Sequence, residues 1–243
     1  MVSLFLKEIT GFFNSLTGYI VIILFILINS LFMWVFDGSM NVLDGGYATM
    51  DTLFSLAPWV FLMLIPAITM RSFSEEKRSG TLDLLLTRPL TELQIVGAKY
   101  LAALVLILLS LLPTLVYFYS IVLLGNPQGN IDQGGTWGSY IGLFCLAGAY
   151  AAIGMFCSSL TDNLIIAFLL AAFMSLAMAY GFEQAGTLLS EGKTGELVLS
   201  LGIIDHYSSM SRGVIDTRDL VYFATVIIVF LLLTKARLQS GKR

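Results

Sequence analysis

Six long apolar runs constrain this chain more than any other feature. They comprise residues 18–36, 53–70, 100–124, 137–160, 164–182 and 220–234, and none has an ionisable side chain in its interior. About 20 helical residues cross roughly 30 Å of hydrocarbon, where a helix satisfies its own backbone hydrogen bonds. The runs predict an all-α polytopic membrane protein with six transmembrane helices. Because the last run is short, we expect its helix to begin earlier or to end at a snorkelling Lys235.

Composition supports lipid as the solvent. The chain is 57% hydrophobic and 12% charged, whereas a soluble domain carries about 25% charged residues. Its net charge is −3, and it has no basic arm or stripe of the kind that contacts phosphate backbones. We therefore expect the lipid bilayer and no nucleic acid among its partners.

The N-terminal segment, residues 1–17, has an amphipathic pattern. Leu4, Phe5, Ile9, Phe12 and Phe13 recur mostly at helical spacing, which is typical of a helix lying in the membrane interface. A water-exposed extension of the first span is the alternative. We interpret the first apolar run as a retained span, and we expect residues 1–243 to form a single transmembrane domain.

The distribution of basic residues predicts the orientation. With six spans, both termini and the loops after spans two and four share one side, which carries ten of the 13 Lys and Arg residues: Lys7, Arg71, Lys77, Arg78, Arg88, Lys99, Lys235, Arg237, Lys242 and Arg243. Lys193, Arg212 and Arg218 lie on the other side. The positive-inside rule makes the first side, with both termini, cytoplasmic.

A polar island at residues 71–89 follows the second span. It contains seven charged residues, namely Arg71, Glu75, Glu76, Lys77, Arg78, Asp83 and Arg88. Ser72 and Glu75 have the spacing of a capping box, which predicts a short helix from Ser72 to about Gly80; Thr91 and Gln94 repeat that spacing before span three. We therefore predict a structured cytoplasmic loop over residues 71–98. The alternative is a solvated turn with residues that anchor it in the membrane interface.

The island also resembles a known signature. FSEEKRSGTLDLLLTRP, residues 73–89, is similar to the EExxxGTxxxLLxxP motif after the second span in permease subunits of type-2 ABC transporters. A second stretch, HYSSMSRGVIDTRDLVYF at 206–223, resembles the outer loop before the last span in the gliding-motility permease subfamily, the GldF type. Together with length and span count, the resemblance covers essentially the whole chain.

The resemblance implies a mechanical role. Such permeases pair as six-helix subunits, so it implies a homodimer or a related second permease. In each subunit of the pair, the loop after span two would act as a coupling helix in a cleft of a separate cytoplasmic ATPase subunit. The two ATPase subunits would bind ATP and Mg. The implied polar contacts are Glu75, Glu76, Lys77, Gly80 and Thr81, and the apolar ones are Leu82 and Leu85, with Pro89 closing the motif.

The long outer loop, residues 183–219, has apolar periodicity of its own, which favours an ordered hairpin apposed to the membrane. In the subfamily comparison it lines an exit or holds an auxiliary extracytoplasmic protein, with candidate residues His206, Tyr207, Arg212, Gly213, Val214, Ile215 and Asp216. His206 is the single histidine. No metal set assembles around it, and Asp205 and Asp216 are better explained as turn and cap residues.

The expected function is that of a permease subunit of an ATP-driven exporter in a bacterial inner membrane, itself not an enzyme. Gly192, Lys193 and Thr194 do not complete a P-loop because Thr187 occupies the required glycine position. A proton-driven carrier is disfavoured by the absence of ionisable residues within the spans. The alternative is a mechanotransmission or anchoring subunit that passes ATPase motion to an extracytoplasmic partner without conducting a substrate.

Overall fold

The computed structural model describes residues 1–87, 90–188, 195 and 198–240, and these residues form helices and connections without a strand. Six helical stretches are long and apolar enough to cross a membrane, confirming the predicted fold class: Leu16–Val35, Asp51–Arg78, Glu92–Leu124, Gln133–Leu160, Leu164–Leu188 and Thr217–Ser240. The last begins before Leu220 and continues past Lys235. Pro89, Arg88, Lys193, Lys242, Arg243 and the Gly192–Thr194 stretch lie outside the described residues.

The N-terminal segment is a helix of its own. Helix α1 (Val2–Asn14) ends at Ser15, whose backbone is extended, and α2 (Leu16–Ser30) with its π-helical turn η1 (Leu31–Val35) forms the first span. Leu4 of α1 is buried, and Phe5, Phe12 and Phe13 pack against the core. The predicted helix is confirmed, while its position in the membrane interface stays a prediction.

The second span, α4 (Asp51–Thr69), leads into α5 (Arg71–Arg78) after a break of one residue at Met70. The predicted capping box at Ser72 is wrong: Ser72 lies inside α5 and is buried, and no side chain of this segment caps its start. The helix begins earlier because the backbone of α4 almost continues into it. It ends as predicted near Gly80, which has φ +69°, a left-handed conformation that glycine adopts at little cost.

The third span begins with the second predicted capping box, which is confirmed. The Thr91 hydroxyl accepts from the Gln94 backbone N–H, and the Gln94 side chain accepts from the Thr91 N–H. From there α7 (Glu92–Leu111) runs to a 3₁₀ turn η2 (Leu112–Thr114) and α8 (Leu115–Leu124). Pro113 sits in that turn, whereas α4 continues through Pro58 and Pro66.

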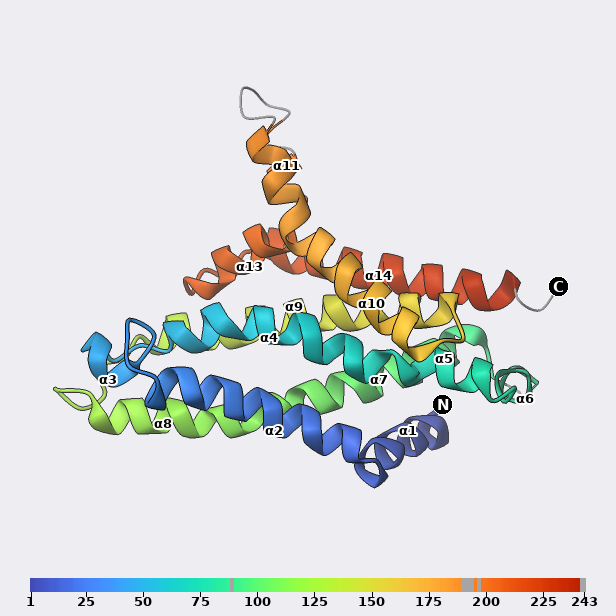
Figure 1. Ribbon diagram of the computed structural model, residues 1–243. Coiled ribbons are helices and arrows are strands. Elements are labelled where there is room, and N and C mark those ends of the chain that lie inside the picture. The colour runs from blue at the N-terminus through green and yellow to red at the C-terminus, as the bar shows by residue number, and fades with distance from the viewer. Residues whose placement is uncertain (88–89, 189–194, 196–197, 241–243) are drawn as a thin grey trace.

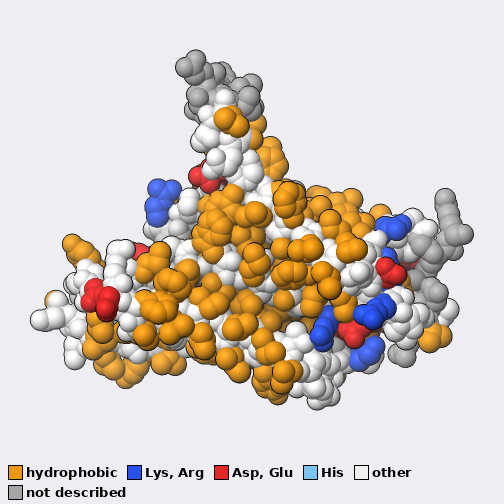
Figure 2. Space-filling view, in the orientation of Figure 1, with side chains coloured by type: hydrophobic (Ala, Val, Ile, Leu, Met, Phe, Trp, Pro, Cys, Tyr) orange, Lys and Arg blue, Asp and Glu red, His pale blue; other side chains and the backbone are white. Residues whose placement is uncertain are grey.

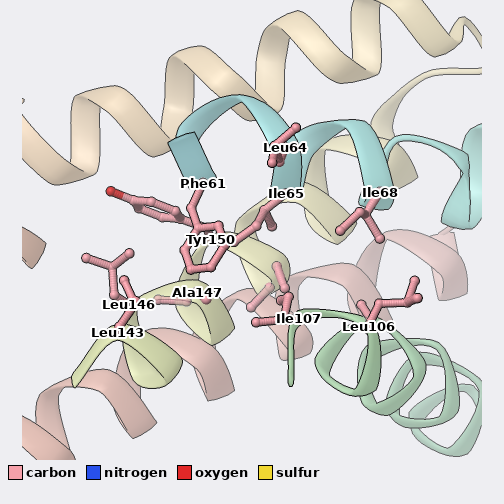
Figure 3. Packing of buried hydrophobic residues seen from close by; sticks show 14 of the residues in the cluster. Phe61, Leu64, Ile65, Ile68, Leu106, Ile107, Leu143, Leu146, Ala147 and Tyr150 are labelled. Carbon is pink, nitrogen blue, oxygen red and sulfur yellow. The ribbon is translucent and has the colours of Figure 1, made fainter. Parts of the chain in front are cut away.

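Helix α9 (Gln133–Leu160) is the most buried of the six spans and the centre of the bundle. Figure 3 shows its residues facing α4 and α7. A Cβ on Gly154 would lie 2.0 Å from the Thr69 hydroxyl of α4, and one on Gly142 would lie 2.8 Å from the Met210 Cβ. These glycines therefore allow α9 to pack closely against other helices of the same chain. The core joins Phe61, Leu64, Ile65, Ile68, Leu106, Ile107, Leu143, Leu146, Ala147 and Tyr150.

The fifth span is longer than predicted. Helix α10 (Leu164–Leu176), the π-helical turn η3 (Ala177–Gly181) and α11 (Phe182–Leu188) form one arm that leans away from the bundle, and the outer loop returns as α13 (Ile203–Ser211) before α14 (Thr217–Ser240). The expected helical fragments of this loop are thus present. Residue 195 is also helical.

The bundle has two distinct ends (Figure 1). Helices α1, α5 and α6 (Leu82–Leu86) and the C-terminal part of α14 lie at one end, and α3 (Val42–Gly45), the α8–α9 connection and α13 lie at the other. Most Lys and Arg side chains visible in Figure 2 gather at the first end. We refer to these as the basic end and the α13 end.

Candidate functional site: the basic end of the bundle

Helix α5 is held to the bundle where it breaks away from α4. The break leaves N–H groups at the start of α5 without partners in their own helix. The Ser158 hydroxyl of α9 accepts from the N–H groups of Phe73 (3.0 Å) and Ser74 (3.1 Å) and donates to the Met70 carbonyl (2.8 Å). The Ser74 hydroxyl donates back to the Ser158 carbonyl at 2.9 Å. One side chain from another helix thus replaces the cap that the sequence predicted locally.

A second attachment lies one turn further along α5. The Lys77 ammonium donates to the Ser159 carbonyl near the end of α9. Because carbonyls in the last turn of a helix lack intrahelical partners and carry partial negative charge, they accept readily from a cation. Lys77, predicted to contact an ATPase, therefore makes an internal contact in this subunit.

Lys99 of α7 supplies the third attachment. Its side chain is only 2% exposed, and its Nζ lies 2.8 Å from Glu8 Oε1 and 2.9 Å from Glu76 Oε1. The same ammonium lies 5.4 Å from the centre of the Phe73 ring. Glu76 is thus an internal partner rather than a free surface group.

The outer face of this segment remains exposed. Glu75, Arg78, Ser79, Gly80 and Thr81 are exposed. Three of the residues predicted to contact an ATPase, Glu75, Gly80 and Thr81, are therefore accessible, while the contact itself stays a prediction. The segment is thus attached to the bundle on one side, and on its outer side it exposes charges of both signs, Glu75 and Arg78.

The apolar positions differ from those the motif implied. Leu85 is 7% exposed and belongs to the core of this chain, and Leu82 is partly buried against it. Leu84, which the motif did not single out, is 69% exposed. On a short amphipathic helix the burial of Leu85 turns Leu84 outward, so Leu84 is the exposed leucine among those whose side chains the structure describes on α6.

A groove of about 350 Å³ separates α1 from α5. Its lining includes Lys7, Glu8, Arg71, Glu76 and Lys99. Arg71 Nε and Glu76 Oε2 are buried there without a hydrogen-bond partner among the described residues. The site is therefore a polar seam between two helices, with charges of both signs on its walls.

The candidate residues of the α13 end divide into two groups. His206 and Tyr207 are buried: His206 Nδ1 lies 2.7 Å from Asp219 Oδ1, its Nε2 lies 2.9 Å from the Ser200 carbonyl, and its ring stacks on Tyr222 at 3.9 Å. The Tyr207 hydroxyl donates to the Phe54 carbonyl at 2.6 Å. These two side chains hold the loop against α4 and α14.

The other group is directed to the surroundings. Arg212, Val214, Ile215 and Asp216 are exposed, and Gly213 is partly exposed with φ +84°. Asp216 Oδ1 accepts from the Arg218 N–H at 3.0 Å, the cap role expected for it. Among the described residues, no three His, Cys, Asp or Glu side chains group closely enough to hold a metal ion.

Sequence reasoning missed two residues that organise the basic end. Ser158 had no signal, because a serine near the end of an apolar helix is common and its partners lie 84 to 88 residues earlier. Lys99 did have one. It lies in the helix that begins at the Thr91 cap, directly before the apolar third span. A cation that is buried at such a position needs a partner of opposite charge.

Comparisons with known proteins agree with this architecture. The family model described as "ABC-2 family transporter protein" matches residues 44–182, more than half of the 243 residues. A comparison with curated proteins finds no match. The matched region begins at the α13 end before the second span and includes α5, α6 and the Ser158 contact. With six apolar helices around a polar loop after the second, the chain belongs to the ABC-2 family of transporter membrane proteins.

Proposed function

We propose that this chain is the membrane subunit of an ATP-driven exporter whose separate ATPase subunits bind ATP and Mg and dock on α5 and α6 at the basic end. Membership of the ABC-2 family supports a permease that works with ABC ATPases. The chain itself then hydrolyses no ATP. The observation that carries the docking site is the combination of a firmly attached base with an exposed tip.

A helix that transmits force must not swing on its own attachment. Ser158, Lys77 and Lys99 bind α5 to α9, α1 and α7, while Glu75, Arg78, Thr81 and Leu84 are exposed at its tip and on α6. We assign the docking contact to these exposed residues. Glu76, Lys77 and Leu85 of the original motif act from inside, as the attachment.

The orientation follows from charge. Seven described basic residues belong to the basic end: Lys7, Arg71, Lys77, Arg78, Lys99, Lys235 and Arg237. By the positive-inside rule we infer that this end, with both termini, is cytoplasmic, and we assign the chain to the inner membrane of a bacterial cell. A cytoplasmic ATPase can then reach α5.

The same reasoning places the α13 end outside. Its exposed Val214 and Ile215, 61% and 45% exposed, lie beside Arg212 and Asp216 and support contact with a second permease copy or an auxiliary extracytoplasmic protein, as in the gliding-motility subfamily. The alternative function, transmission of ATPase motion without a conducted substrate, uses this same contact. A homodimer is the simplest assembly in which two ATPase subunits each find a docking helix.

The test is whether an ATPase subunit copurifies with this chain. The tagged chain is purified from native membranes in mild detergent, its partners are identified by mass spectrometry, and ATP hydrolysis of the eluate is measured. Leu84→Asp places a charge on the proposed contact. We expect it to reduce ATPase recovery at least about tenfold, the effect of losing a central apolar contact.

Leu43→Asp is the matched control. Leu43 is 61% exposed on the short helix α3, at the opposite end from Leu84. We expect this variant to retain the ATPase. Equal retention by both variants would refute the docking site, and recovery of the wild-type chain without any nucleotide-hydrolysing subunit would refute the proposed function itself.

A further inference from the structure

We propose that Lys99 is a positioning residue that ties the N-terminal helix α1 to the docking helix α5, so that the two helices move as one unit. The tie is inferred from contacts within this chain. Only the agent that displaces α5, an ATPase, rests on the proposed function.

Both helices are joined to their spans by short breaks. Helix α1 meets α2 through the single residue Ser15, which has φ −101° and ψ 147°. Helix α5 follows α4 after the one-residue break at Met70, whose backbone stays helical with φ −55° and ψ −31°. An extended residue such as Ser15 transmits orientation poorly, because its backbone dihedral angles can change without disturbing a hydrogen-bonded ladder. Something other than chain continuity must set the relative position of α1 and α5.

Lys99 lies on α7, which is uninterrupted from Glu92 to Leu111. Its single ammonium reaches Glu8 on α1 and Glu76 on α5 at nearly equal distances, 2.8 and 2.9 Å. It also lies over Phe73, the fully buried aromatic residue of α5. A side chain from a continuous helix therefore contacts both α1 and α5 at one point.

Burial makes this tie costly to break. The carboxylate side chains are 16% exposed for Glu8 and 14% for Glu76. Separating either from Lys99 leaves a largely buried carboxylate without the ammonium that it pairs with, which is unfavourable. The ammonium is in addition shared between two carboxylates, so loss of one contact alters the charge balance felt by the other.

Helix α1 needs such a tie. A helix of 13 residues is marginal in water without tertiary contacts. Its apolar side is anchored by Leu4 and the phenylalanines, but its polar side faces α5 across the groove. Glu8 is the residue of α1 that spans this seam to a buried partner. When α5 is displaced, the least costly response keeps the ammonium paired, so α1 follows.

The experiment is hydrogen exchange with mass spectrometry on the purified full-length chain in detergent. Glu76→Gln removes a charge from α5, and its effect is measured as the hydrogen-exchange rate of α1. Glu8→Gln removes a charge from α1, and its effect is measured as the exchange rate of α5. We expect each substitution to speed exchange in the other helix at least about tenfold, because local opening becomes easier when a buried charge pair is broken.

Glu75→Gln is the matched control, since it makes the same change at the neighbouring, exposed position of α5. It should leave α1 exchange unchanged. Lys99→Arg keeps the charge and should restore much of the protection that Lys99→Met removes. A purely local role predicts faster exchange only in the mutated helix; that result would overturn the tie.

A second measurement tests transmission in the complex with its ATPase, trapped with ATP and vanadate. Trapping should change exchange in both α5 and α1 of the wild-type chain, and only in α5 of Glu76→Gln. A wild-type response confined to α5 would overturn the transmission. If no ATPase copurifies, the proposed function fails, and the exchange experiment on the isolated chain still decides the tie.

Discussion

The two ends of the bundle are fastened by buried polar residues of different kinds. At the basic end, buried Lys99 and Ser158 bind a helix whose tip, with Glu75 and Leu84, stays exposed. At the α13 end, His206 and Tyr207 turn inward and the loop is fastened against α4 and α14. Both stretches looked like surface motifs in the sequence. The comparison teaches that some charged residues of a motif attach it to its own subunit, while others are exposed to a partner.

Removal of His206 should have the largest effect. His206→Phe leaves the buried Asp219 carboxylate, whose Oδ2 already lacks a partner among the described residues, without its hydrogen-bond partner at Oδ1. We expect a loss of about 3–5 kcal/mol in the free energy of unfolding, measured by denaturation in detergent, with faster hydrogen exchange in α13 and an unchanged basic end.

The double variant His206→Phe with Asp219→Leu is the control for that cost. Replacing both members of a buried pair by apolar groups is often nearly neutral, so it should recover much of the stability. If the single variant is as stable as wild type, the α13 loop is not fastened by this pair and the contrast between the ends fails.

Loss of the Ser158 hydroxyl should rank second. Ser158→Ala leaves the N–H groups of Phe73 and Ser74 and the Met70 carbonyl without this partner. At about 1–3 kcal/mol per unsatisfied buried group, partly offset by rearrangement, we expect a loss of about 2–3 kcal/mol. Hydrogen exchange in α5 should rise, and ATPase activity of the purified complex should fall.

Ser159→Ala is its neighbour control. The Ser159 hydroxyl donates only within its own helix, to Phe156, and the carbonyl that accepts from Lys77 is retained. We expect a change within about 0.5 kcal/mol. Equal effects of the two substitutions would show that the Ser158 contacts do not attach α5.

The smallest effect should come from Tyr207→Phe. The change removes one hydroxyl, which donates to the Phe54 carbonyl, and keeps the ring. A single neutral hydrogen bond contributes about 1 kcal/mol. Denaturation in detergent measures it, and a loss as large as that of His206→Phe would mean that the hydroxyl, rather than the contact between His206 and Asp219, fastens the α13 end.

Much of the architecture could be predicted because its causes are local. Uninterrupted apolar stretches must be helical in lipid, so the six spans follow from residue order. The Thr91 cap and the stop at Gly80 also depend on a few neighbouring residues. The segregation of basic residues to one end followed from counting spans.

The failures have a shared physical reason. Ser72 has capping chemistry, yet α5 begins at Arg71 because α4 almost continues into it and because Ser158, remote in sequence, supplies the hydrogen bonds. Likewise Leu85 matches the motif's apolar contact, but the core of this chain buries it and exposes Leu84. Packing decided which of two similar leucines faces outward.

By itself, the sequence determined the number of spans, the polar island after the second span and the resemblance to ABC permeases, since these depend on hydropathy, length and residue order. Only the tertiary structure decided which island residues attach and which are exposed. That division depends on partners such as Glu8 and Ser158, brought beside α5 by the packing of α1, α7 and α9. Burial and pairing are properties of this packing, and residue spacing along the chain does not encode them.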